Sequence, residues 1–479
     1  MNGSATVFLL LNAIALLRLP RRWAPLPLLL GTCYMTLGQE IVLGSLHFTV
    51  IRILVAVGFL RVALRGEHLA GGPNGLDWLM AAWGLWALLS SFFHDDVAAT
   101  FVNHLGIVYN ACGIYVLLRF FCQSLDDVIM LSRITAILLV PLSLLMLIEK
   151  TTGHNLFSML GGVAEISEIR DGRIRAQGPF AHPILAGTAG AVCLPLMIGL
   201  RRSHRTAGNW GAAACAAMIV ASTSSGPILS ALSGIGALFM WRWRYRMRIV
   251  RWAAILGYVG LDVVMNAPAY YLLARIDLTG SSTGWHRAAL IEAAVKHLSE
   301  WWLAGTDYTR HWMAYGVGWS PNHVDITNHY LQMGVTGGLL LAVLFIAVLA
   351  KAFSFVGIGL RRRAGMPFAD RFMIWTLGAA LFAHATTFVS VSYFDQTFVF
   401  LYLTLAAISA VRRVPPRIGT GTTTGARMTK GSGGRNPRDR QEKGARTQEA
   451  PSRSLCWNDP AVHSQEGELV VPGKVRGNR

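Results

Sequence analysis

Long apolar segments follow one another along most of the first 411 residues. An α-helix needs about 20 apolar residues to cross the roughly 30 Å hydrocarbon core of a bilayer. Because backbone amides in that core have no water to bond with, each segment must satisfy them internally as a helix. We therefore predict an all-α, polytopic integral membrane protein with about twelve transmembrane helices. The apolar segments are residues 5–18, 24–38, 41–60, 76–93, 102–118, 128–148, 182–200, 209–223, 226–241, 249–265, 331–355, 371–391 and 395–411.

The composition agrees with a bilayer as the solvent. Of the 479 residues, 53% are hydrophobic and 14% are charged, whereas soluble domains have roughly 25% charged residues. The six cysteines lie mostly inside apolar segments and show no paired spacing. That pattern predicts neither a disulfide framework nor a cysteine-ligated metal.

Basic residues are concentrated in short loops between the apolar segments. They produce a formal net charge of +18, which could otherwise suggest a nucleic-acid partner. Lysine and arginine in short loops are retained on the cytoplasmic side of a membrane. We therefore predict that these loops are cytoplasmic and that nucleic acid is not a partner. The clusters are residues 18–22, 201–205, 242–251, 361–363 and the tail from Arg412.

The basic clusters also set the sidedness of the longer loops. Two apolar segments separate each neighbouring pair of clusters from residue 201 onward. This predicts that the loops 149–181 and 266–329 lie on the opposite, periplasmic or extracellular, side. We predict a membrane domain over residues 1–411, with amphipathic helices in its large second loop. Residues 412–479 are poor in apolar residues and are predicted to form a disordered, basic cytoplasmic tail.

Both outside loops carry arginine, the residue that the charge rule disfavours there. The first loop contains Arg173 and Arg175, and the second contains Arg275, Arg287 and Arg310. The planar guanidinium matches the oxygens of a phosphate group, so we interpret these residues as a site for an anionic ligand. Alternatively, the arginines of the first loop form ion pairs with nearby acidic residues, which are Glu165, Glu168 and Asp171.

The second outside loop contains a predicted amphipathic helix. Apolar residues recur at three- and four-residue steps between Trp285 and Trp302, which is the spacing of one helix face. Tryptophans on such a face are typical of the headgroup layer. On the polar face, Glu292 and Lys296 are spaced for an ion pair. Arg287 has no acidic residue three or four positions away, which leaves it available for a ligand.

Three short motifs resemble those of the bacterial O-antigen ligase and polymerase family. The first, RAQGPFAHP, starts at Arg175 and leads into an apolar segment. The second is Arg287 near the start of the amphipathic helix, and the third is TNHYLQMGVTGG over residues 327–338. Thr327 stands where the family usually has a histidine, so that histidine is not carried over directly. The resemblance covers roughly residues 40–411 in topology.

This resemblance implies a glycosyltransferase of the bacterial inner membrane with its active site at the periplasmic face. Its donor would be a glycan carried on undecaprenyl diphosphate, which it would pass to an acceptor hydroxyl. In a ligase the acceptor is lipid A-core, and in a polymerase, the first alternative, it is another repeat unit. The second alternative is a transporter or flippase for a lipid-linked glycan. Transporters commonly place charges near the membrane midplane, where this chain has few.

The candidate site residues follow from this chemistry. Arg175 and Arg287 are predicted to stabilise the charge on the diphosphate leaving group. The attacking hydroxyl must lose a proton; we predict His329 as its first acceptor and His323 as its second, with Asp325 as an orienting residue or alternative base. Any of the histidines could instead cap a helix or bond to backbone. The other predicted substrate-binding residues are Arg173, His182, Arg275 and Arg310, and no metal or other cofactor is expected.

Overall fold

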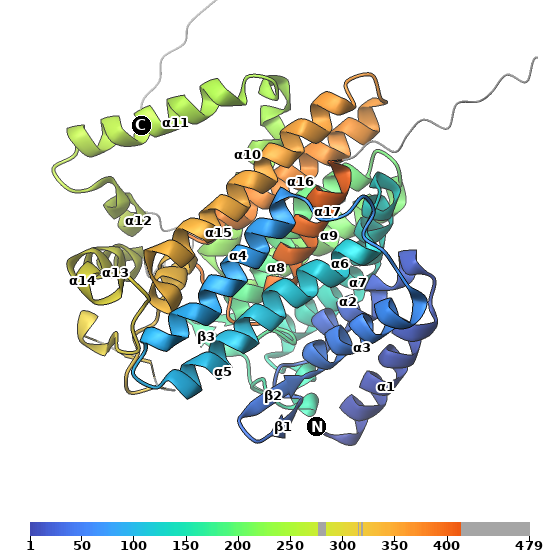
Figure 1. The fold of residues 1–479 in the computed structure, drawn as a ribbon, viewed down its shortest axis with the longest axis horizontal. Helices are drawn as coiled ribbons and strands as arrows, with labels where there is room; N and C mark the ends of the chain where they lie inside the picture. The colour runs from blue at the N-terminus through green and yellow to red at the C-terminus, as the bar shows by residue number, and fades with distance from the viewer. Residues whose placement is uncertain (276–283, 315, 318–319, 413–479) are drawn as a thin grey trace, which may run out of the picture. The chain divides into compact units, whose positions relative to one another are not determined.

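The computed structural model of this chain describes residues 1–275, 284–314, 316–317 and 320–412, and it is mostly helical (Figure 1). Apart from Arg412, the predicted tail lies outside the described residues. The helices are α1 (Gly3–Arg18), α2 (Pro25–Tyr34), α3 (Val50–Arg65), α4 (Gly75–Ser90), α5 (Val97–Val108), α6 (Ile114–Phe121), α7 (Leu125–Thr152), α8 (Pro183–Leu200), α9 (Arg205–Ser222), α10 (Ser225–Phe239), α11 (Met247–Val264), α12 (Leu272–Arg275), α13 (Gly284–Lys296), α14 (Leu298–Trp301), α15 (His329–Arg362), α16 (Phe368–Thr387) and α17 (Phe398–Val411). Two antiparallel hairpins pair β1 (Glu40–Leu43) with β2 (Leu46–Thr49) and β3 (Glu168–Arg170) with β4 (Arg173–Arg175).

Five helical stretches in the described part of the chain are long and apolar enough to cross a membrane. This agrees with the predicted all-α membrane protein, while the count of about twelve spans stays a prediction. Helix α11 covers nearly the same residues as the predicted segment 249–265, and it is not among the five. The five stretches are Gly75–Phe93, Val97–Phe121, Leu125–Thr152, Pro183–Leu200 and His329–Arg362.

Two predicted spans near the N-terminus are shorter than expected. The segment 24–38 is helical only over the ten residues of α2. In the segment 41–60, the first residues form the β1–β2 hairpin, whose turn contains Gly44 at φ 62°, and α3 starts only at Val50. Apolar character alone does not separate helix from strand here, because isoleucine and valine suit both a buried helix and a strand.

Helix α8 is the most deeply buried of the five stretches, and it packs against α9, α10 and α16 (Figure 1). Small residues make this close approach possible. A Cβ atom on Gly190 would lie 2.8 Å from the carbonyl oxygen of Cys215, and one on Gly187 would lie 2.3 Å from the hydroxyl oxygen of Ser222. Both partners are in α9. Glycines at such positions let membrane helices approach closely, so they set the spacing between α8 and α9.

Replacing Gly190 with valine is expected to lower the free energy of unfolding by about 1–3 kcal/mol, the usual cost of overpacking. The matched control is Gly236→Val in α10, where an added Cβ would meet no atom within 4 Å. Thermal unfolding of both purified variants in detergent measures the difference. A Gly190 variant as stable as the Gly236 variant would contradict the close packing of α8 against α9.

The first predicted outside loop is tied to the end of α7 by Glu149. The carboxylate accepts hydrogen bonds from the backbone N–H groups of Gln177 (2.9 Å) and Gly178 (2.7 Å). The turn between β3 and β4 consists of Asp171 and Gly172, at φ 50° and 72°, as is typical of an Asp-Gly pair in a two-residue hairpin turn. These contacts hold the motif RAQGPFAHP against the helices.

The second predicted outside loop has a small apolar core of its own. The predicted helix is present as α13, but it ends at Lys296, and the separate helical turn α14 follows. On the predicted apolar face, Ala288 is buried, whereas Trp285 and Trp302 are exposed; a position of these tryptophans in the headgroup layer stays a prediction. The loop packs against the side of the helix that carries Leu290, Ala293 and Ala294, and the tryptophans lie outside this core. The core residues are Leu290, Ala293, Ala294, Trp301, Trp312, Val324, Ile326 and Val335.

A break in α15 brings this loop close to the helices. Gly338 has φ 76°, and a Cβ atom there would lie 2.2 Å from the carbonyl oxygen of Leu303. Gly305 has φ 99°, and its Cβ would lie 2.3 Å from the carbonyl oxygen of Val335. Glycine is the residue that tolerates both the positive φ and the close backbone approach. The backbone of residues 303–305 therefore passes directly against α15, just before Asp307.

Candidate functional site

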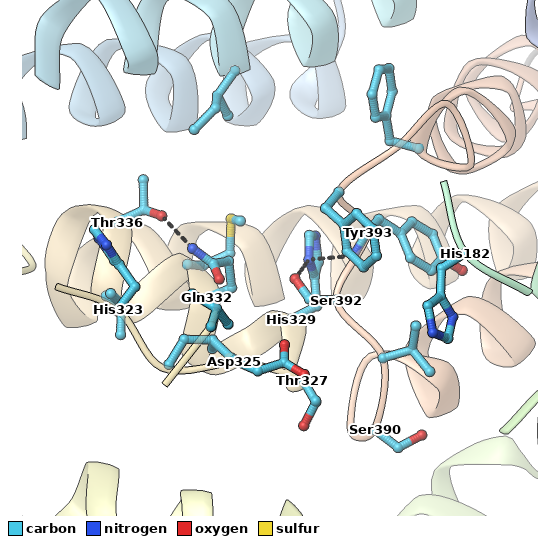
Figure 2. A pocket seen from close by; sticks show the side chains of 18 of the residues that line it. His182, His323, Asp325, Thr327, His329, Gln332, Thr336, Ser390, Ser392 and Tyr393 are labelled. Atoms are coloured by element: carbon cyan, nitrogen blue, oxygen red, sulfur yellow. Dashed lines mark hydrogen bonds between the residues drawn. The ribbon is translucent and has the colours of Figure 1, made fainter. Parts of the chain in front are cut away.

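A cavity of about 910 Å³ is lined by both predicted outside loops and by ends of several helices. Six of the nine predicted site residues contribute to its wall: Arg175, His182, Arg287, His323, Asp325 and His329. In Figure 2, Asp325 and Thr327 lie between His182 and Ser390 on one side and His323, Gln332 and Thr336 on the other. The wall also contains polar residues that were not predicted, among them Arg170, Ser224, His94, Asn103, His104, Asp307 and Gln332.

Arg175 is buried at the end of β4 and is held by two partners. Its Nη1 lies 2.7 Å from Oε1 of Glu168, the residue opposite it in the hairpin, and its Nη2 donates to the hydroxyl of Ser224 (2.7 Å). The ion-pair alternative therefore applies to Arg175. Since Glu168 is partly exposed, it balances part of the charge and fixes the guanidinium at the cavity wall.

Arg287 reaches the same cavity from α13. Its Nε donates to the carbonyl oxygen of Ser390 (3.1 Å), and within the described part of the chain it forms no ion pair with a carboxylate. Burial lowers the pKa of Arg287, the nearby guanidinium of Arg170 lowers it further, and Asp325 opposes both effects. An arginine side chain still stays charged near neutral pH. Arg170, at the end of β3, also lines the cavity, so three guanidinium groups from two loops surround one space.

Asp325 is the carboxylate beside these cations. It lies in the segment before α15 (Figure 2). Burial raises the pKa of Asp325, although His286 and Arg287 partly lower it again. A carboxylate with a raised pKa is a stronger base than an ordinary aspartate. Asp325 is therefore well suited to take a proton from a ligand in the cavity.

His329 is buried among aromatic rings at the start of α15. Its Nδ1 accepts the backbone N–H of Tyr393 (3.3 Å) and lies 3.2 Å from the Ser392 hydroxyl (Figure 2). The ring centroids of Phe388 and Phe345 are 4.7 and 5.2 Å away. When Nδ1 accepts a hydrogen bond, the neutral ring carries its proton on Nε2 and has no second lone pair. This geometry favours Asp325 over His329 as the proton acceptor.

His323 lines the cavity on the side of Gln332 and Thr336 (Figure 2). Its Nδ1 lies 2.7 Å from the hydroxyl oxygen of Ser320, which orients the ring. Thr327, at the position where a histidine is usual in the resembling family, also lines the cavity. Its buried hydroxyl has no hydrogen-bond partner among the described residues, so a ligand could bond to it.

His182 has the capping role that was one of its two predicted possibilities. Its Nδ1 accepts the backbone N–H of Ile184 (3.1 Å) at the start of α8. Burial lowers the pKa of His182 to about 4, and the guanidinium groups of Arg175 and Arg170 contribute, against an opposing effect of Glu168. The ring is therefore neutral near pH 7. Because Nδ1 accepts, Nε2 carries the proton and can donate to an anionic ligand.

Three predicted substrate-binding residues are not among the residues that line this cavity. Arg310 donates to the carbonyl oxygens of Met313 (2.8 Å) and Ala314 (3.2 Å) and so organises its own loop. Arg173 and Arg275 are exposed. The reason is geometric, because membership of the same loop does not bring every arginine to the same side of it.

The wall of the cavity also contains a histidine pair that the sequence did not indicate. Nδ1 of His94 lies 2.7 Å from Oδ1 of Asp307, and its Nε2 lies 2.9 Å from the carbonyl oxygen of Ala304. The ring of His104 lies edge-on to His94, with centroids 5.5 Å apart. His94 falls between two predicted apolar segments and His104 lies inside the second of them, and nothing in the sequence links either residue to the loop that carries Asp307.

Comparison with known proteins assigns no family to the chain. No protein-family model matches it, and no curated protein is significantly similar to it. The resemblance to O-antigen ligases and polymerases therefore stays a prediction that depends on short motifs around Arg175, Arg287 and Thr327.

Proposed function

We propose that the protein transfers a glycan from undecaprenyl diphosphate to an acceptor hydroxyl at the periplasmic face of the bacterial inner membrane, as an O-antigen ligase does. One observation carries this proposal: Arg175 and Arg287, from separate loops, line one cavity together with Arg170. Guanidinium groups held in place suit a diphosphate, because they stabilise charge without rearranging during the reaction.

The proposed reaction is a displacement at the anomeric carbon of the donor sugar. The acceptor oxygen forms the new glycosidic bond, and the bond from the anomeric carbon to the diphosphate oxygen breaks. The electron pair of that bond leaves with undecaprenyl diphosphate, whose added charge Arg175 and Arg287 stabilise. The acceptor hydroxyl gives its proton to the carboxylate of Asp325. The step as written uses no metal ion.

The arrangement of the cavity wall suggests where each substrate binds. Arg287 is anchored at Ser390, and His182 lies near Arg175, so the cationic wall is the side of His182 and Ser390 in Figure 2. The other side carries uncharged polar groups such as Gln332 and Thr336. Amide and hydroxyl groups of this kind suit sugar hydroxyls, so we place the acceptor there and Asp325 between the two substrates.

His329→Gln is expected to retain glycan transfer within about tenfold of the wild-type rate, because the histidine is assigned a packing role. Removal of a general base would instead cost about 10²–10⁴-fold. Glutamine can still accept the N–H of Tyr393. The measurement is the transfer rate per folded protein, with the amount of folded protein determined by gel filtration. A loss of more than about 10²-fold in folded protein would return the base role to His329.

The test of the proposed function separates bond exchange from movement. Purified protein is supplied with undecaprenyl-diphosphate-linked glycan and an acceptor, and glycosylated acceptor and released undecaprenyl diphosphate are both measured. Equal amounts of the two products are expected. In parallel, liposomes with labelled donor in one leaflet report movement across the bilayer. Movement without bond exchange would support a transporter or flippase, and extension of the donor glycan itself would support a polymerase.

A further inference from the structure

A cluster of two histidines and one glutamate lies outside the cavity. Nδ1 of His297, between α13 and α14, lies 2.7 Å from Oε1 of Glu300. Nε2 of His311, in the helical turn Arg310–Trp312, lies 3.0 Å from Oε2 of the same carboxylate. The donor atoms of the three side chains all lie within 4.8 Å of one another. None of the three residues lines the cavity.

We propose that His297, Glu300 and His311 bind a divalent transition-metal ion of the Zn²⁺ class. Two imidazoles and one carboxylate are a ligand set that Zn²⁺ accepts, with a water molecule in the fourth position. Ligand atoms at about 2.0–2.1 Å from a tetrahedral ion are about 3.3 Å apart. The 2.7 and 3.0 Å separations are shorter than that value, so the carboxylate and the two imidazoles must move apart by a few tenths of an ångström to admit the ion.

The surroundings of the cluster fix its carboxylate and leave all three side chains accessible from solvent. Glu300 also accepts the indole N–H of Trp312 (2.9 Å), which fixes the carboxylate beside the two imidazoles. Each of the three side chains is about one third exposed, so an ion can enter from solvent.

Neighbouring rings hold the two imidazoles in place. His297 stacks on Trp312, with centroids 5.7 Å apart, and His311 stacks on Tyr308 at 5.0 Å. Groups that fix the orientation of a ligating ring raise the affinity for the metal. A bound ion would join α14 to the turn Arg310–Trp312 and so secure the segment that carries Asp307. This inference does not depend on the proposed function.

The experiment measures Zn²⁺ binding to tag-free, full-length protein that has first been stripped with a chelator. The wild type is expected to retain one more Zn²⁺ ion per chain than His297→Ala or His311→Ala. Each variant should bind Zn²⁺ at this site at least tenfold more weakly than the wild type. The control is His154→Ala, whose exposed histidine lies outside the cluster. Elemental analysis after dialysis gives the stoichiometry, and titration gives the affinity.

Thermal unfolding provides a second readout that does not involve activity. Zn²⁺ is expected to raise the unfolding temperature of the wild type and of the control, because an ion that binds the folded state stabilises it. It should leave the unfolding temperature of Glu300→Gln and His311→Ala nearly unchanged. Equal Zn²⁺ content and equal stabilisation in all variants would mean a hydrogen-bonded cluster only and would overturn the proposal. Since the cluster is partly exposed, we expect these variants to fold.

Discussion

Replacing Arg287 with alanine is expected to reduce the rate of glycan transfer by about 10²–10³-fold, the usual effect of removing one fixed group that stabilises transition-state charge. Arg287 makes no ion pair within the described residues, so its charge is available to a diphosphate. Its hydrogen bond to the carbonyl oxygen of Ser390 orients the guanidinium without neutralising it. The measurement is the initial rate of product formation by purified protein.

Arg275→Ala is the matched control, because it removes the same charge from the same loop at an exposed position away from the cavity wall. It should leave the rate unchanged within about twofold. Arg287→Lys keeps the charge but loses the planar fork, and we expect an intermediate rate. Equal rates in the Arg287 and Arg275 alanine variants would exclude Arg287 from the reaction.

Asp325→Asn is expected to lower the transfer rate by about 10²–10⁴-fold, since an amide cannot accept the proton of the acceptor hydroxyl. The donor should still bind, because the three guanidinium groups remain. The expected result is therefore a loss in kcat with little change in KM for the donor. Asp171→Asn is the control, since Asp171 is exposed in the β3–β4 turn at φ 50°, a conformation that asparagine also adopts.

The same assignment predicts how the wild-type rate depends on pH. Asp325 is active as a base only when it is deprotonated, so the rate should fall as pH decreases through its pKa. Because burial raises that pKa, the fall should begin at a higher pH than for an ordinary aspartate. The acid limb should disappear in Asp325→Asn. An unchanged acid limb and rate in that variant would show that another group takes the proton.

The helices could be predicted from the sequence because apolar segments in a bilayer have few other choices. The hairpin of the first loop could also have been predicted, since Asp171-Gly172 is a strong turn signal. That turn pairs Arg170 with Arg173 and Glu168 with Arg175. Residues opposite one another share a face of the hairpin, so this signal would have indicated both Arg170 and the partner of Arg175.

Other parts of the site depend on contacts that no local pattern contains. His94 contacts Asp307, which lies 213 positions away in the chain. Nδ1 of His329 is hydrogen-bonded to Ser392 and Tyr393, which follow α16 in the sequence. A motif around residue 329 therefore predicts that a histidine lies at the site, but not whether its lone pair is free. For the same reason the sequence did not indicate that Leu290 and Ala294 of α13 are buried, because their packing partners, among them Trp312 and Val335, come from farther along the chain.

The most direct measurement of the central claim is the affinity of the purified protein for undecaprenyl diphosphate without a glycan. Arg175→Ala and Arg287→Ala should each weaken binding by about 10- to 100-fold, the usual contribution of a charge-assisted hydrogen bond. Arg275→Ala should bind like the wild type. If both cavity variants bind undecaprenyl diphosphate as tightly as the wild type, the two arginines do not hold one diphosphate, and the account is wrong.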